Sequence, residues 1–390
     1  MGLRLETLSQ DHLKRSLRIA FVVNPFRLRR GGAEHAPVLS RELLGLGHHC
    51  RGFGAAPGVI PRSRADMGSE SLGLLGYSPD VIVAYDAHSP AGWQGARCAR
   101  RLHVPLIAVE EGVAVNRGGF GRVLRSSANL LWGARVRQTV SRLVSLDAVA
   151  RTQAIQAGYR IEDIELFSPG VDLTRYRPGL RSDLLHRHGV HGRALLVLSP
   201  LEEGRGLEET LEAFAQTVGR REDWDLVFAG GGSYRAALRA HAARLGVGAQ
   251  VHWIGQPRDE ELPGLLGSSV LLLVPGQDSA TSARHLRLAM ASGLPALATD
   301  EPRFSELVQD DRSGLLVQRA VQGDWVRALE QATRAPQARE RWGLCAREIA
   351  TERLAWPRIA ARFAELLGEA VVQGPEAELR RREWSWGRRA

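Results

Sequence analysis

The sequence is almost without lysine: Lys14 is the only one, so nearly all of its 52 Lys and Arg residues are arginine. The net charge is +9 and the calculated pI is about 10.3. This balance favours nucleic acid, an anionic membrane face or a phosphate-bearing ligand as partner, although codon bias explains the arginines equally well. The arginines are spread along the chain and no zinc-finger, RNP or basic-zipper pattern is present. We therefore expect a membrane surface or a diphosphate, and no nucleic acid.

Cysteine and long apolar runs are also scarce. Cys50, Cys98 and Cys345 lie far apart and match neither a metal spacing nor a disulfide framework, so we expect reduced structural thiols. No apolar run reaches the roughly 18 residues that span a bilayer. The first 23 residues carry scattered charges and no signal-peptide pattern. These absences predict a cytoplasmic protein.

Short apolar runs alternate with amphipathic stretches along the chain of 390 residues, a length that fits two domains. Strand, helix, strand, helix repeated twice predicts an α/β protein with two doubly wound parallel sheets. The expected strands are Leu17–Val23, Val81–Ala84, Pro105–Val109, Leu143–Ser145, Ile164–Phe167, Ala194–Leu198, Leu226–Ala229, Val251–Ile254, Val270–Val274 and Pro295–Ala298.

A charged stretch containing Pro and Gly near residues 172–193 separates the two halves. It predicts Rossmann-like domains at 1–180 and 181–354 that face a cleft, where ligands of open α/β sheets bind. We expect a helix at about 355–372 to pack back on the first domain. The basic tail 373–390 places Trp384 and Trp386 among five arginines, which suits an anionic membrane interface or a frayed end.

Five sequence blocks follow one another in an order and spacing that can be compared with known families. A glycine loop containing Gly31 and Gly32 follows the first strand, and the hinge reads SPGVDLTRYRP (168–178). The second half contains LLVLSPLEEGRGLEETLEAF (195–214), DLVFAGGGSYR (225–235) and LRLAMASGLPALATDEPRFSE (286–306). Together these blocks resemble the retaining glycosyltransferases of family 4, which have the GT-B fold. The resemblance implies a nucleotide-sugar donor, a polysaccharide, lipid-linked or other glycan acceptor, and no metal or other cofactor.

The resemblance assigns the donor diphosphate to the glycine loops and to the loop after the second domain's first strand. Gly31, Gly32, Gly230 and Gly231 would let the backbone approach the phosphates. The family's usual Arg and Lys pair is reduced to one cation, because its first position is Pro200 and its second is Arg205. A guanidinium can still clasp a phosphate through two hydrogen bonds, although Arg205 also suits a solvated loop.

The family's two donor-binding glutamates, eight positions apart, read as Ala280 and Leu288. This is a degenerate Glu-x7-Glu signature. Asp278 is a candidate replacement for the first carboxylate. Glu306 stands at the family's later glutamate, where it either contacts the nucleotide or simply begins a helix. Losing a hydrogen bond to a charged acceptor costs about 1.5–3 kcal/mol, so donor recognition is expected to weaken.

In the first domain, the resemblance points to YDAHSP (85–90), with Asp86 and His88 at the carboxyl end of a strand. Glu111 occupies the position of the family's sugar-contacting histidine. Its carboxylate suits sugar hydroxyls or a base for the acceptor alcohol, although Glu110 beside it makes a plain acidic loop an equal alternative. A lone histidine such as His88 is also commonly structural.

These observations predict a retaining, metal-independent hexosyltransferase of the cytoplasm. Attachment to the inner face of the membrane as a peripheral protein is compatible with this prediction. The alternative is a GT-B-shaped binding or regulatory subunit without catalysis. The replacements at Pro200, Ala280 and Leu288 keep that alternative open, because all three fall at donor contacts.

Overall fold

The computed structural model describes residues 15–23, 35–54, 68–87, 89–112, 133–276, 279–318, 321 and 323–386. The chain forms two compact units. Unit 1 comprises Met1–Gly170 and Trp356–Ala390, and unit 2 comprises Val171–Ala355. The chain passes from unit 1 to unit 2 at residue 171, earlier than the boundary at residue 180 that the sequence suggested. The reason is that Val171 pairs with Ala355, and that Val171 and Tyr176 are both 3% exposed in the core of unit 2.

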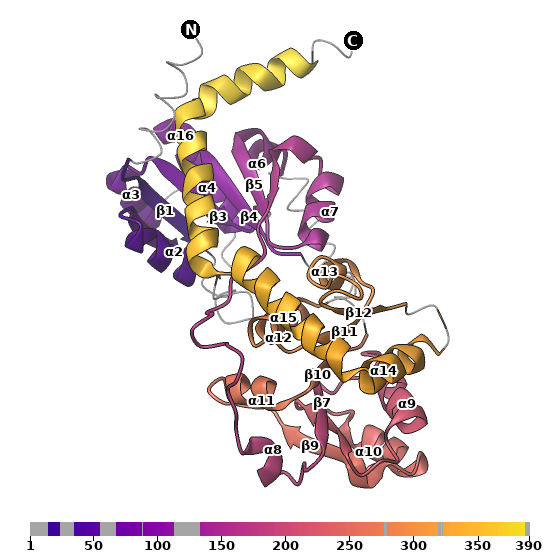
Figure 1. Cartoon of the computed structure of the whole chain (residues 1–390). Coiled ribbons are helices and arrows are strands. Elements are labelled where there is room, and N and C mark those ends of the chain that lie inside the picture. The colour runs from indigo at the N-terminus through magenta and orange to yellow at the C-terminus, as the bar shows by residue number, and fades with distance from the viewer. Residues whose placement is uncertain are drawn as a thin grey trace. The chain divides into compact units, whose positions relative to one another are not determined.

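Unit 1 is built on a six-stranded sheet of order β2-β1-β3-β4-β5-β6, in which every paired neighbour is parallel (Figure 1). Its central strands are continuous apolar runs because parallel sheets are covered on both faces. The strands are β1 (Arg18–Val23), β2 (His49–Gly54), β3 (Val81–Tyr85), β4 (Leu106–Glu110), β5 (Val140–Ser145) and β6 (Ile164–Leu166).

Helices cover both faces of this sheet. Side chains from α3, α4, α6 and α7 pack in one core cluster, while α2 and the first half of α16 pack in the other. The helices are α2 (His35–Gly45), α3 (Gly68–Tyr77), α4 (Pro90–Leu102), α6 (Ala134–Thr139), α7 (Ala148–Gln156) and α16 (Trp356–Trp386), with the short η3 (Ile161–Asp163). The chain therefore returns to unit 1 through α16 and completes its core.

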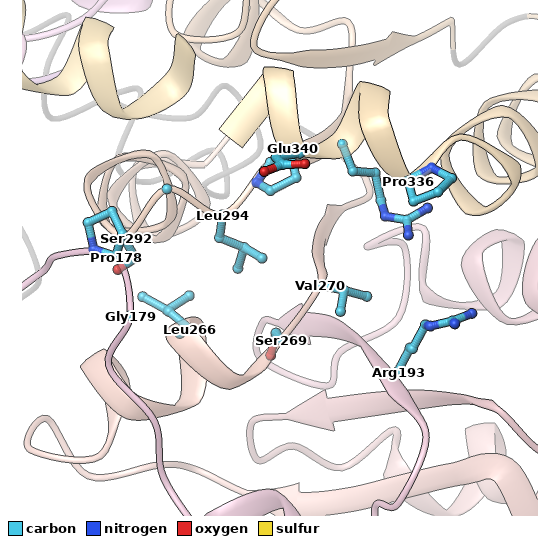
Figure 2. Close-up of a pocket in the computed structure, with 14 residues that line it drawn as sticks. Pro178, Gly179, Arg193, Leu266, Ser269, Val270, Ser292, Leu294, Pro336 and Glu340 are labelled. Carbon is cyan, nitrogen blue, oxygen red and sulfur yellow. The ribbon is translucent and has the colours of Figure 1, made fainter. Parts of the chain in front are cut away.

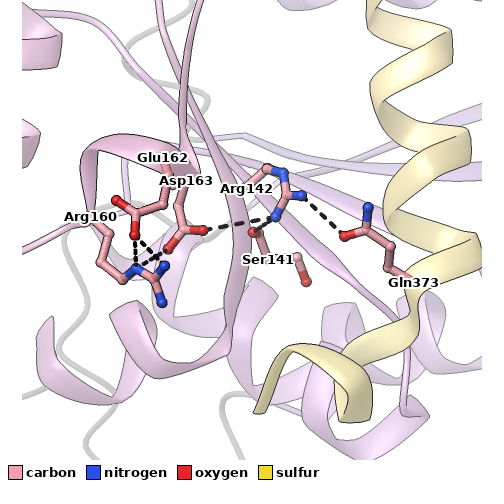
Figure 3. Close-up of polar contacts among 6 residues, drawn as sticks. All are labelled: Ser141, Arg142, Arg160, Glu162, Asp163 and Gln373. Atoms are coloured by element: carbon pink, nitrogen blue, oxygen red, sulfur yellow. Dashed lines mark hydrogen bonds and ion pairs between the residues drawn. The ribbon is translucent and has the colours of Figure 1, made fainter. Parts of the chain in front are cut away.

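A polar network also holds α16 on the sheet (Figure 3). Arg142 of β5 donates to Gln373 Oε1 at 3.1 Å and lies 3.9 Å from an oxygen of Asp163. Arg160 in turn pairs with Asp163 at 3.7 Å. Directly after this contact, Gly374 leaves the helical conformation (φ 64°, ψ 157°), which divides α16 into two helices. The contacts with the sheet described here all come from the first of them.

Unit 2 repeats the architecture with the sheet order β12-β11-β10-β7-β8-β9, again with parallel neighbours. Its strands are β7 (Arg193–Leu198), β8 (Trp224–Ala229), β9 (Val251–Gly255), β10 (Leu271–Val274), β11 (Ala296–Thr299) and β12 (Gly314–Val317). Its helices are α8 (Leu184–Arg187), α9 (Leu207–Thr217), α10 (Arg235–Arg244), α11 (Leu262–Ser268), α12 (Ala280–Ala291), α13 (Pro302–Ser305), α14 (Asp324–Arg334) and α15 (Pro336–Arg353), with η4 (Gly248–Gln250).

Each sheet thus follows the doubly wound α/β pattern that the sequence predicted. Among the helices that the structure describes, none is long and apolar enough to cross a membrane. In the same described residues, no three His, Cys, Asp or Glu side chains are grouped as metal ligands.

Candidate active site

The candidate donor site lies at the carboxyl edge of the unit 2 sheet, where parallel strands deliver their following loops. The loop from β7 to α9 contains Arg205 and ends at Gly206, the N-cap of α9. Gly206 has no side chain, so no capping hydrogen bond covers the amide groups of the first turn. Such a helix start attracts an oxyanion.

Arg205 is engaged by a carboxylate of its own loop. Its Nη2 and Nε lie 2.6 and 2.9 Å from Glu202 Oε2, and the two side chains are 30% and 55% exposed. An exposed pair three residues apart is worth only about 0.2–1 kcal/mol. Arg205 can therefore exchange Glu202 for a diphosphate at small cost.

The other carboxylates of this segment make the candidate donor site less positive than one arginine suggests. Glu203, Glu208 and Glu209 lie close enough to Tyr234 to act on its hydroxyl. The hydrogen bond that its hydroxyl donates to Glu208, together with burial and the negative charges, raises the pKa of Tyr234 to about 12. Tyr234 thus holds Glu208 at the start of α9.

The glycine turn after β8 packs against the β7–α9 loop. A Cβ atom at Gly230 would overlap the carbonyl oxygen of Ser199, so only glycine fits there. Leu201 N donates to Gly231 O at 2.9 Å, and Gly231 itself has open space around its Cα. The role shown for Gly230 is close packing of two loops, while Gly231 alone leaves room for a ligand.

Helix α12 carries the two positions at which the family has glutamates. Ala280 is its first residue, and Leu288 is 5% exposed within the core cluster of unit 2. Both positions lack an acceptor. Asp278, proposed as a substitute, lies outside the described residues.

His285 on the same helix is a candidate site residue that the sequence analysis missed. Its side chain is buried, and its Nδ1 lies 2.8 Å from the carbonyl oxygen of Leu198, at the carboxyl end of β7. Burial lowers the pKa of His285 to about 4; the bond to Leu198 opposes this shift, and the charges of Arg284 and Arg287 add to it. The ring is neutral at pH 7 and donates from Nδ1, which makes Nε2 an acceptor. The sequence gives no indication of this contact, because a single histidine within a helical pattern does not reveal which strand end it lies against.

Glu306 caps the C-terminus of α13 and is half-buried. The neighbouring turn is fixed by Asp300, whose Oδ2 accepts from Gln318 Nε2 at 2.5 Å and whose Oδ1 accepts from Ser305. The loop after β11 is therefore ordered by side chains, and it places Glu306 after the carboxyl end of β11. The alternative that Glu306 begins a helix is wrong, because Glu306 follows the last residue of α13.

The carboxyl edge of the unit 1 sheet gathers carboxylates. Asp86 follows β3 with φ 63°, an unusual conformation for a residue other than glycine. Its amide donates to Val109 O at 2.9 Å, and the next amide, Ala87 N, donates to Glu110 Oε1 at 2.6 Å. The buried Glu110, 5% exposed, thus fixes the turn that contains Asp86.

Glu111 is half-buried and follows Glu110 directly. The next residue, Gly112, donates to Asp147 Oδ2 at 3.3 Å, and Asp147 Oδ1 accepts from Ala150 N at 2.7 Å. Glu110 and Asp147 therefore order this edge, while Asp86 and Glu111 remain the candidates for substrate contact. His88, Gly31 and Gly32 lie outside the described residues, so their roles stay predictions.

Comparison with known proteins identifies the second half of the chain. Residues 188–349 match the family model described as glycosyl transferases group 1. A GDP-mannose-dependent alpha-mannosyltransferase of Mycolicibacterium smegmatis is 29% identical over 320 residues, covering 80% of this chain and 78% of the relative. A D-inositol 3-phosphate glycosyltransferase of Rhodococcus erythropolis is 28% identical over 315 residues, covering 72% of this chain and 71% of the relative.

Solved structures agree on the fold. A glycosyltransferase from Rickettsia africae superimposes with a TM-score of 0.74 at 12% identity, covering 90% of this chain and 98% of that one. HepE from Anabaena, solved in complex with UDP, gives a TM-score of 0.69 at 18% identity, covering 90% of this chain and all of that one. Residues 188–349 therefore match a group 1 glycosyl transferase domain, and the chain has the fold of the GT-B glycosyltransferases.

Proposed function

We propose that the chain transfers a hexose from a nucleoside-diphosphate sugar to a hydroxyl group of a glycan or lipid-linked acceptor. The observation that carries this proposal is Arg205 beside the uncapped start of α9, at the carboxyl edge of unit 2. A guanidinium next to free helical amides is suited to a diphosphate. At the edge of unit 1, the carboxylates of Asp86 and Glu111 are suited to accept hydrogen bonds from an acceptor's hydroxyl groups.

The proposed reaction retains the configuration at the anomeric carbon and needs no metal ion. The bond between the anomeric carbon and the diphosphate oxygen breaks, and a bond to the acceptor oxygen forms. The proton of the acceptor hydroxyl passes to the departing diphosphate. Arg205 stabilises the negative charge that develops on that leaving group.

The names of the relatives suggest which donor to test first. The relative from Mycolicibacterium smegmatis and a similar one from Mycobacterium tuberculosis are named GDP-mannose-dependent alpha-mannosyltransferases, whereas HepE was solved with UDP. We propose GDP-mannose as the first donor and UDP-linked hexoses as the second. Because Ala280 and Leu288 provide no carboxylate, we expect weak discrimination among the hydroxyl groups of the donor sugar.

A thermal-shift titration with GDP-mannose, UDP-glucose, ADP-glucose and dTDP-glucose tests the donor proposal, followed by release of the diphosphate in the presence of acceptor. We expect one nucleotide class to raise the Tm of the wild type and to leave the Arg205→Ala variant unchanged. Arg239→Ala, which removes an exposed arginine of α10, is the matched control. No response to any donor would refute the proposal. Stabilisation without turnover would favour the binding-subunit alternative.

We further propose a cytoplasmic location with peripheral contact to anionic membrane. The support is the run of five arginines with Trp384 and Trp386 at residues 380–390. Deleting residues 375–390 should reduce co-sedimentation with vesicles containing anionic lipid at low salt. Equal sedimentation of the two proteins would contradict the proposal.

A further inference from the structure

A cavity of about 360 Å³ lies at the opposite edge of the unit 2 sheet, around the amino ends of β7, β10 and β11 (Figure 2). Arg193 begins β7, Val270 precedes β10, and Leu294 and Pro295 precede β11. The Arg205 loop follows the other end of β7, and a strand rises about 3.3 Å per residue. The cavity is thus separated from the candidate donor site by roughly the length of this strand.

Two arginines give the cavity a positive end. The guanidinium carbons of Arg193 and Arg339 each lie 5.4 Å from the centre of the buried Trp224 ring. Arg339 donates to the carbonyl oxygens of Ala332 and Thr333 at the end of α14. Among the described residues, no carboxylate oxygen lies within 4.0 Å of its guanidinium nitrogens.

The carboxylate that pairs with Arg193 is shared with a second arginine. Arg193 pairs with Asp223 at 2.9 Å, and Asp223 also pairs with Arg221 at 3.1 Å. Burial lowers the pKa of Arg339, and the positive charge of Arg193 adds to that shift. Of the two neighbouring cations, only Arg193 therefore pairs with a carboxylate of the described residues, and that carboxylate also pairs with Arg221, so an oxyanion bound between Arg193 and Arg339 would be stabilised.

The rest of the wall suits the body of a small ligand. Ser292 lines the cavity with 5% of its surface exposed, and its Oγ has no hydrogen-bond partner. Leu266 and Leu294 supply apolar surface, and the exposed Glu340 adds an acceptor at the rim (Figure 2). A buried hydroxyl without a partner is unusual in native proteins and is explained when a ligand supplies the partner.

We propose that this cavity binds a small organic oxyanion, a phosphate or carboxylate carried on a body of monosaccharide size. Arg193 and Arg339 hold the oxyanion, while Ser292 and Glu340 form hydrogen bonds with hydroxyl groups of the body. The volume lies at the low end of ligand pockets, which limits the body to about one sugar ring. This second site does not depend on the donor site, because it shares no residue with it.

Isothermal titration of the full chain at low salt tests the proposal with glucose 6-phosphate, glucuronate, neutral glucose and inorganic phosphate. We expect saturable binding of glucose 6-phosphate or glucuronate, and whichever binds identifies the anion as phosphate or carboxylate. Binding should weaken about tenfold or more in Arg193→Gln and Arg339→Gln. Ser292→Ala should weaken binding of the sugar without affecting inorganic phosphate.

The matched controls are Arg341→Gln, which removes an exposed arginine of the same helix α15, and Arg205→Ala at the donor site. Both should bind like the wild type. Arg339 also supports the end of α14, so Arg193→Gln, at a half-exposed side chain, keeps the test valid if Arg339→Gln fails to fold. The proposal is overturned if neither charged sugar binds, or if neutral glucose or inorganic phosphate binds as tightly. Binding that is lost in Arg205→Ala and kept in Arg193→Gln also overturns it.

Discussion

If Arg205 binds the donor diphosphate as proposed, replacing Glu202 with glutamine is expected to tighten donor binding, because Glu202 would compete with the diphosphate for Arg205. The two side chains meet at 2.6 Å in an exposed loop, so their pair contributes about 0.2–1 kcal/mol. Removing the carboxylate should make the free energy of donor binding more favourable by up to that amount, which corresponds to at most about a fivefold lower Kd. Removing Arg205 instead deletes a charge-assisted bond of about 1.5–3 kcal/mol and should weaken binding about tenfold to a hundredfold.

A double-mutant cycle separates this competition from a general effect of charge. Donor Kd is measured by titration calorimetry at low salt for the wild type, Glu202→Gln, Arg205→Ala and the double variant. We expect the gain from Glu202→Gln to disappear when Arg205 is absent. Glu222→Gln, at an exposed carboxylate of the same unit, should leave the Kd unchanged. An equal gain in both backgrounds, or a wild-type Kd for Arg205→Ala, would refute the reasoning.

Three further predictions concern stability. Glu110→Ala should lower the free energy of unfolding by about 1–3 kcal/mol in denaturant titrations, because it leaves the buried Ala87 amide without its acceptor; an unchanged midpoint would contradict this. Gly230→Ala should lower the Tm, since the new Cβ overlaps Ser199 O, and a wild-type Tm would show that the loops separate freely. His285 has a folded pKa of about 4 against 6.5 ordinarily, so the unfolded chain binds its proton first as the pH falls. Its contribution is complete above about pH 6.5 and is lost toward pH 4, by about 3 kcal/mol, and His285→Gln should flatten the pH profile in that window.

Most of the fold could be predicted from sequence because parallel strands are buried on both faces. All ten expected strands are present, and each consists mainly of apolar residues, which the sequence alone reveals. The two that were missed, β2 and β12, are edge strands. β2 reads HCRGFG and buries only Phe53 fully, so its pattern does not differ from that of a loop.

The candidate site was only partly predictable, because side-chain partners come from the fold. The sequence placed Arg205 in the loop after the first strand of unit 2, where the structure has it, but gave no sign that Glu202 would pair with it. It also could not decide which of two adjacent carboxylates turns inward. The structure buries Glu110 and leaves Glu111 half-exposed, since alternate residues at a strand end face opposite sides.

The return of the chain to unit 1 through α16 has a consequence for synthesis on the ribosome. Unit 2 is complete once residue 355 has emerged, whereas unit 1 must wait for residues that follow it. Until then the side chains of α2 and β1 lack Ile359, Phe363 and Leu367, which cover them in the finished core. The nascent N-terminal half is therefore expected to expose an apolar face while unit 2 is translated, and an apolar face exposed in this way is what chaperones bind.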